Sequence, residues 1–234
     1  MEVVVEAIEG AWQLLVGRDQ VTYEVLWRSL RISLSATGIA LALGLPIGMG
    51  LAVGRFPGRR TLYMLANTGM GLPPIVVGLV VTVLLWRSGP LGGLGLLYTP
   101  TAMVIAQAAI ATPVVIALSA AALQHVDEEF RLQMRGIGAS RLRSLWELGR
   151  EARLPLLAVA MAGFGAAISE VGAALMVGGN LQGETRVLTT AAVLEASRGR
   201  FAAALAFGFV LLTVALAVNL TLTTLQQRGR ATHR

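Results

Sequence analysis

One carboxylate, Glu170, lies within an otherwise uncharged apolar run that extends from about Leu154 to Val177. An ionisable side chain in such a run is costly to bury, and it usually has a function when the run crosses a membrane. We expect this carboxylate to pair with an arginine or with backbone N–H donors. A purely structural pairing is the alternative to a functional one.

Other residue types exclude several kinds of chemistry. The chain has no Cys, which excludes disulfides and thiolate metal sites, and His125 and His233 have no partners at metal-ligand spacing. No combination of Ser, His and acid suggests covalent catalysis, so we assign no catalytic residue and no metal site. All nineteen basic residues are Arg, whereas a P-loop binds nucleotide phosphates with a Lys. Any energy from ATP must therefore come from a partner protein.

Pro73 and Pro74 interrupt a second apolar run, from about Thr61 to Trp86. Each proline removes a helix N–H donor, so the pair should bend or unwind the helix. Unwound backbone at membrane depth occurs where protein buries it or where it lines a cavity. Freed N–H groups would suit a tetrahedral anion, and the alternative is a static kink that packs against a neighbouring helix.

The longest polar stretch covers residues 124–153 and predicts a helical hairpin. Its centre is a glycine turn at Gly136 to Gly138. Apolar and small residues recur after the turn at helical spacing: Leu142, Leu145, Trp146 and Gly149. Such a hairpin is a compact knob that can dock into a groove on a partner. The alternative is a solvated loop, but the length, the apolar stripe and the glycine turn together favour the knob.

The composition places these features in a membrane protein. Hydrophobic residues make up 55% of the 234 positions and charged residues only 14%, against about 25% in soluble domains. Five apolar runs are each long enough to cross a bilayer as a helix. They cover about residues 32–53, 61–86, 101–123, 154–177 and 201–225. The sequence therefore predicts an all-α integral membrane protein with five transmembrane helices.

The N-terminal segment, residues 1–24, predicts an amphipathic helix outside the five spans. Three acidic residues share one helical face, and apolar residues share another. The acidic residues are Glu2, Glu6 and Glu9, and the apolar ones are Val4, Ile8, Ala11 and Leu15. A signal peptide would open with positive charge instead. We expect this helix to lie at the membrane surface.

The arginines predict the orientation of the spans. Five spans put the two termini on opposite sides, and twelve Arg fall in the 55–60 loop, the 124–153 stretch and the C-terminal tail. The excess of basic residues in short loops marks the cytoplasmic side, so the C-terminus should be inside and the N-terminus outside. Arg28 and Arg31 count against this orientation. The net charge of +6 is explained by topology, and no nucleic-acid-binding motif accompanies it.

The run Gly138 to Arg141 (G-A-S-R), followed by Leu154-Pro155, resembles the coupling loop of ABC importer permeases. In that family the segment reads E-A-A, three residues, G, and then a helix that ends near L-P. Here Leu132, Gln133 and Met134 stand in place of E-A-A, and the gap before L-P is a few residues longer. The resemblance implies that an ABC ATPase docks on Met134, Arg135, Gly136, Gly138, Ala139, Ser140 and Arg141.

Four further segments are similar to oxyanion importer permeases, most of all to the tungstate type. They are N-T-G-M-G-L-P-P-I-V-V-G-L at 67–79, R-S-G-P-L-G at 87–92, S-E-V-G-A at 169–173 and G-N-L-Q-G-E-T-R-V-L-T-T-A at 179–191. The molybdate type shares the double proline and an E-x-G-A segment. The resemblance therefore implies an importer of a tetrahedral oxyanion, most simply tungstate, with molybdate and then sulfate as alternatives.

The resemblance also implies a type I ABC importer permease fold for residues 25–230, with the 124–153 stretch as cytoplasmic coupling loop. The expected assembly in the bacterial or archaeal inner membrane is a homodimer with two ABC ATPase subunits, which bind the ATP and Mg, and an external substrate-binding protein. We expect Pro73, Pro74 and Glu170 to serve the pathway or its gate. A secondary transporter, the alternative class, usually has more spans and internal repeats. A membrane-embedded enzyme would need convergent titratable groups, which Glu170 alone does not supply.

Overall fold

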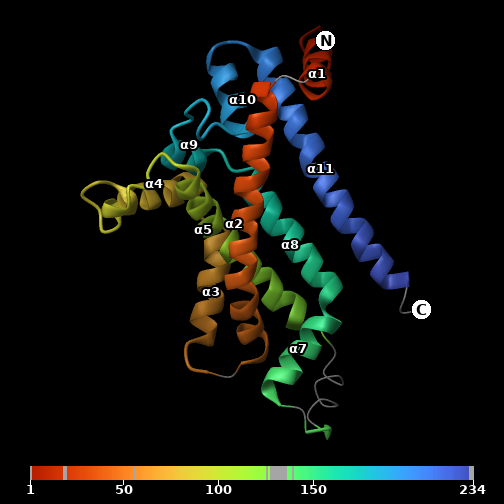
Figure 1. The fold of residues 1–234 in the computed structure, drawn as a ribbon. Helices are drawn as coiled ribbons and strands as arrows, with labels where there is room; N and C mark the ends of the chain where they lie inside the picture. Colours follow the sequence, from red (N-terminus) through yellow and green to blue (C-terminus); the bar gives the residue numbers. More distant parts are fainter. Residues whose placement is uncertain are drawn as a thin grey trace.

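The computed structural model describes residues 2–17, 20–54, 56–124, 126, 136–138 and 140–231, and the regular elements in these ranges are all helices (Figure 1). This confirms the expected all-α class. The helices are α1 Glu2–Val16, α2 Gln20–Val53, α3 Arg59–Met70, α4 Pro74–Leu85, the 3₁₀ turn η1 Gly92–Leu94, α5 Pro100–Gln124, α7 Arg141–Glu151, α8 Arg153–Ile168, α9 Gly172–Gly178, α10 Leu188–Ser197 and α11 Phe201–Ala231.

Three of these helices, α2, α5 and α11, are long and apolar enough to cross a bilayer by themselves. If each of two bent pairs is counted as one span, the number rises to as many as five. These pairs are α3 with α4, bent by 104°, and α7 with α8, bent by 76°. The expected break at Pro73 and Pro74 is therefore present. The expected fourth span, 154–177, differs from the structure, because α8 ends at Ile168 and a separate short helix, α9, begins at Gly172.

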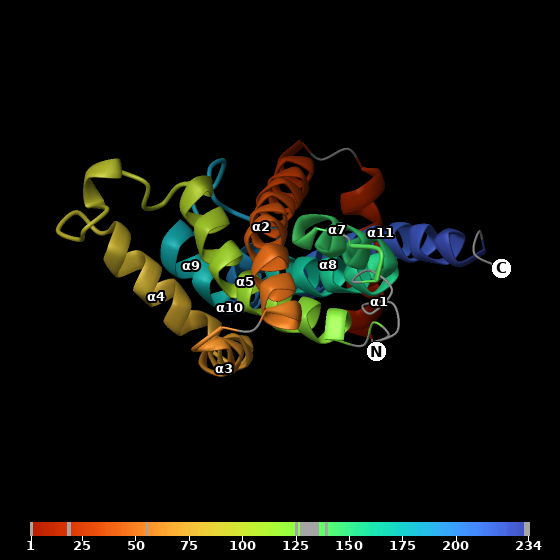
Figure 2. The ribbon, with the colours of Figure 1, turned by 90° about the horizontal axis from the view of Figure 1, so that it is seen from below.

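The centre of the bundle is the contact between α2 and α5, which lie side by side in both views (Figures 1 and 2). Small residues let the two helices approach closely. A Cβ added to Gly44 would lie 2.6 Å from Val115 Cγ1, and one added to Gly48 would lie 2.9 Å from the Ile116 carbonyl oxygen. Gly50, by contrast, has no atom within 4 Å of an added Cβ. Gly44 and Gly48 therefore form the packing surface of α2 against α5, and Gly50 does not contribute to it.

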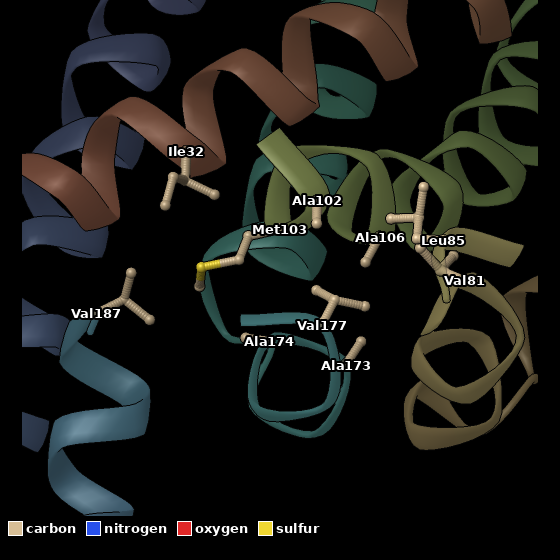
Figure 3. Packing of buried hydrophobic residues seen from close by; sticks show 10 residues of the cluster. All are labelled: Ile32, Val81, Leu85, Ala102, Met103, Ala106, Ala173, Ala174, Val177 and Val187. Atoms are coloured by element: carbon tan, nitrogen blue, oxygen red, sulfur yellow. The ribbon is translucent and has the colours of Figure 1, made fainter. Parts of the chain in front are cut away.

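A second core joins the half-length helices to the bundle. Figure 3 shows ten buried residues from α2, α4, α5, α9 and the start of α10: Ile32, Val81, Leu85, Ala102, Met103, Ala106, Ala173, Ala174, Val177 and Val187. Seven of them are Ala or Val, so the backbones of α4, α5 and α9 pack at short range. The two short helices are thus held in place by burial although neither is long enough to span a membrane.

The N-terminal helix α1 packs against the beginning of α11 (Figure 1). Ala7 and Ala11 are buried in this contact, and a Cβ added to Gly10 would lie 3.4 Å from Ala206 Cβ. The three acidic residues are exposed, as their spacing predicts, and so are Val4 and Ile8. The apolar residues of α1 therefore divide into a face that contacts α11 and an exposed face. Its position at the membrane surface stays a prediction.

The glycine contacts yield a matched test of helix packing. Gly48→Ala should lower the free energy of unfolding by about 1–3 kcal/mol, because the added methyl group meets Ser119 and the backbone of α5. Gly50→Ala should leave stability unchanged or slightly raise it, because Ala is the better helix former and the site is open. Thermal or denaturant unfolding in detergent measures both, and equal effects of the two variants would refute the assigned packing face.

Candidate functional site

The first helix break lies between α3 and α4. The amide of Gly71 donates to the Thr68 carbonyl at 3.0 Å, which ends α3 in a tight turn. Pro73 has an extended backbone, with φ −60° and ψ 122°, and Pro74 is the first residue of α4. This is where the two prolines are best tolerated, since a residue before Pro avoids the helical region and Pro suits the first helical position. The break is therefore encoded locally.

The amide groups at the start of α4 bear on the anion hypothesis. Pro74 has no amide hydrogen, and the amides of Val76 and Val77 donate to the Pro73 carbonyl at 2.9 and 3.4 Å. Within this described turn, Ile75 alone has an amide hydrogen without such a bond. The two prolines interrupt the helix, but the amides of Val76 and Val77 find an acceptor, so few N–H groups remain free. An anion site made of backbone amides would depend on Ile75, and it stays a prediction.

The second break lies between α8 and α9, and Glu170 forms it. This side chain is buried, with 5% of its surface exposed, and its Oε1 accepts a hydrogen bond from the Ala173 amide at 2.7 Å. Glu170 lies one residue before Val171, the N-cap of α9, and its carboxylate satisfies one of the amides that a helix start leaves without an intrahelical partner. The Glu170 carbonyl also accepts from Thr189 Oγ1 of α10 at 3.0 Å. Glu170 therefore pairs with a backbone N–H donor, which was one of the two kinds of partner expected from the sequence. Its role in a gate stays a prediction.

The two breaks lie against each other. A Cβ added to Gly172 would lie 3.4 Å from Ile75 Cβ, and one added to Gly78 would lie 2.5 Å from Ala173 Cα. The first turns of α4 and α9 therefore cross at backbone contact distance, which glycine alone permits at position 78. Pro74 and Glu170 are almost a hundred positions apart in the sequence, but the helices that begin at these two breaks contact each other in their first turns.

The loop from α9 to α10 is fastened to α2 by polar contacts that the sequence did not predict. Arg28 donates to the carbonyls of Gly183 and Arg186 at 2.6 and 3.1 Å, and the amide of Leu188 donates to Ser29 Oγ at 2.9 Å. Thr185 is buried in the same loop. Its Oγ1 donates to the Gly178 carbonyl and accepts from the Leu181 amide. Arg28 counts against the expected orientation, but its hydrogen bonds hold the loop between α9 and α10 against α2.

The expected docking knob, residues 124–153, is described in part, as residues 124, 126, 136–138 and 140–153. Gly138 has φ +66°, and Ser140 caps α7 by accepting the Arg143 amide at 3.3 Å on its Oγ. Ile137 and Trp146 are 67% and 68% exposed. Met134, Arg135 and Ala139 lie outside the described residues, and Arg141 begins α7.

One face of the knob is buried against the ends of α2 and α5. Leu148 and Ala152 form a cluster with Ala52 of α2 and Leu123 of α5. A Cβ added to Gly149 would lie 3.2 Å from Met49 Cε of α2. Figure 1 shows α7 at the same end of the bundle as the connection from α2 to α3. A force on α7 would therefore act directly on the two central helices.

The Glu170 contact predicts a difference between two substitutions. Glu170→Gln keeps an oxygen that can accept the Ala173 amide, so its stability should stay close to that of the wild type. Glu170→Ala leaves a buried N–H group unpaired and should lower the free energy of unfolding by about 1–3 kcal/mol. Unfolding in detergent measures stability, and coupled transport by Glu170→Gln tests the gate: full coupling would leave Glu170 with a structural role only.

Comparisons with known proteins agree with this geometry. Residues 44–230 match the family described as binding-protein-dependent transport system inner membrane component. The chain is 37% identical over 227 residues to the tungstate uptake system permease protein TupB of Peptoclostridium acidaminophilum, covering 97% of this chain and 100% of that protein. It is 40% identical over 196 residues to a probable anion ABC transporter permease protein of Haloferax volcanii, covering 82% and 84% of the two chains.

A more distant relative and a solved structure extend the comparison. Identity to the molybdenum transport system permease protein ModB of Escherichia coli is 28% over 177 residues, which cover 70% of this chain and 77% of that protein. The fold is similar to a chain of the inward-facing MetNI methionine ABC transporter, with a TM-score of 0.75 and 18% identity over 91% of this chain and 98% of that one. The chain therefore belongs to the binding-protein-dependent transport system inner membrane components, the permease family of ABC importers.

Proposed function

We propose that this chain is the membrane-spanning subunit of an ATP-driven importer of tungstate. The observation that carries the proposal is the match to a tungstate uptake permease over the entire length of that protein. Molybdate is the alternative, supported by the lower identity to a molybdenum permease, and sulfate is a more distant one. The chain carries no Lys for a P-loop, so ATP and Mg would be bound by a partner ATPase.

The proposed assembly has two copies of this chain, two ABC ATPase subunits and an external substrate-binding protein. The ATPase side would be the end that holds α7 and the connection from α2 to α3, and α3 begins at this end with Arg59 and Arg60. The other end holds α1 and α10 (Figure 1). Basic residues near span ends mark the cytoplasmic side. This supports an external N-terminal segment 1–24, a permease domain 25–230 and a cytoplasmic coupling loop 124–153.

The proposed mechanism is alternating access driven through the knob. Closure of the ATPases on ATP would push α7, and the buried contacts of Leu148 and Ala152 would carry the movement to α2 and α5. Packed cores transmit such displacements because they are nearly incompressible. The breaks next to Pro73 and Glu170 would then let α4 and α9 turn relative to the long helices, because element ends absorb backbone changes most easily.

Transport assays in liposomes test the substrate. The chain would be reconstituted with the ATPase and binding protein from its own genome, and ATP-dependent uptake of tungstate, molybdate and sulfate would be measured at equal concentrations. We expect tungstate to enter fastest and to suppress molybdate uptake in competition. ATP-dependent uptake of molybdate in preference to tungstate would overturn the substrate assignment, and uptake without the ATPase would overturn the ABC mechanism.

The glycine turn of the knob provides a matched pair of variants for ATPase docking. An Ala at Gly138 should cost about 1–2 kcal/mol, because this residue has a left-handed backbone. That cost should weaken ATPase binding or coupled transport by roughly tenfold. Gly136→Ala is the control, since Gly136 is helical and has no atom within 4 Å of an added Cβ. Co-purification and coupled ATPase activity measure both, and equal behaviour of the two variants would refute the role of the turn.

A further inference from the structure

Helix α3 differs from the other candidate spans in its exposed face. It contacts α5 through buried Ala66 and through Gly69, whose added Cβ would lie 2.7 Å from Pro113 Cβ. In both views α3 lies at the edge of the bundle (Figures 1 and 2). The residues that point away from α5 follow helical spacing and are all exposed. The polar members of this face are Arg60, Thr61, Asn67 and Thr68, and Met64, Leu65 and Gly71 are exposed beside them.

Two residues of this face, Asn67 and Thr68, have unused hydrogen-bonding groups. Within the described chain neither side chain bonds to another protein group. Several other hydroxyls in the helices donate to the carbonyl four residues earlier, as Ser and Thr in helices often do. Examples are Thr82, Thr112, Thr213 and Thr221, with distances of 2.6–2.8 Å. Asn67 and Thr68 make no such bond within the described residues, so their donors and acceptors remain available to a partner.

Lipid cannot be that partner. Transfer of an amide or hydroxyl into an apolar medium without a hydrogen bond costs roughly 2–7 kcal/mol. Polar residues within spans accordingly face the bundle interior or a water-filled cavity. Asn67 and Thr68 lie one turn before the break at Pro73, and unwound backbone at membrane depth also requires a protein or aqueous surrounding. The break is satisfied by its own protein contacts, so the two polar side chains are what place this turn against water or a polar protein surface.

The charge of this face indicates which solute would use the water. Helix α3 contains no Asp or Glu, and Arg60 lies exposed at the end that the proposed topology puts in the cytoplasm. The Asn67 amide and the Thr68 hydroxyl can each donate to an oxygen without carrying a charge. Neutral donors suit a solute that must bind and then leave, because conduction requires weak binding.

We propose that the polar face of α3 lines the cytoplasmic half of the translocation pathway, and that Asn67 and Thr68 donate hydrogen bonds there to the tetrahedral oxyanion. This rests on the proposed import function and adds the residues that contact the substrate within the membrane. The pathway would lie between two copies of the chain, each with its α3 face toward the water.

Thiol labelling tests the pathway without reference to the anion. The chain has no Cys, so Asn67→Cys and Thr68→Cys introduce single thiols, and Leu216→Cys, at an exposed apolar position of α11, is the control. A charged methanethiosulfonate reagent would be applied to the assembled transporter in liposomes, with and without ATP. We expect labelling of Cys at position 67 or 68 to be at least tenfold faster than at position 216 in one of the two states.

Uptake by substituted transporters tests the contact with the anion. Asn67→Asp places a carboxylate on the pathway and should reduce oxyanion uptake at least fivefold, while Asn67→Leu removes the donor and should reduce it less. Thr213→Val is the control, since that hydroxyl is bonded within α11. Co-purified ATPase confirms that each variant assembles. Wild-type uptake by Asn67→Asp would overturn the contact with the anion.

Labelling and uptake can fail separately. Slow labelling at positions 67 and 68 in both nucleotide states, or a disulfide between two copies without labelling, would show a dry contact and overturn the pathway. Failure of the wild-type transporter to import any oxyanion would instead overturn the proposed function, whatever the labelling shows. Fast labelling together with selective loss of uptake in Asn67→Asp supports both parts of the inference.

Discussion

Hydrocarbon contains no water to satisfy a backbone polar group, and this constraint governs where the chain can leave a helix. Both breaks within the apolar runs meet it through protein contacts. At the first, the Pro73 carbonyl accepts the amides of the next turn. At the second, Glu170 supplies an oxygen to the Ala173 amide, and Thr189 supplies a hydroxyl to the Glu170 carbonyl. Because the two breaks also lie against each other, each one shields the other from lipid.

The stiff and the deformable parts of the molecule lie in different helices. Helices α2 and α5 approach closely through Gly44 and Gly48, and each continues as one helix past an internal proline, Pro46 in α2 and Pro113 in α5. The knob is buried against the ends of these same two helices, through Leu148 and Ala152. Displacement at the knob is therefore applied to the rigid pair, while the backbone freedom lies at the interrupted helices α3–α4 and α8–α9. Such an arrangement converts a push at one end into rotation of short elements elsewhere.

The sequence predicts the features that depend on local chemistry. The break at Pro73 and Pro74, the glycine turn at Gly138 and the five apolar runs all follow from backbone and hydropathy rules. The break at Glu170 was not predicted, because it depends on contacts with Ala173 and on Thr189, which comes from another helix. The same holds for Arg28, whose acceptors are carbonyls more than 150 positions away. Hydropathy alone reads 154–177 as one span, since burial in protein and burial in lipid favour the same residues.

The distribution of charge within the spans also fits the passage of an anion. A carboxylate exposed on the pathway would repel an oxyanion, but Glu170 is buried and bonded to the start of α9. An arginine in the middle of the pathway would bind the anion tightly and slow its release, and α3 instead carries its arginines at one end. On the proposed pathway, the neutral donors of Asn67 and Thr68 would give weak binding, and the arginines at the mouth would attract the anion toward the exit.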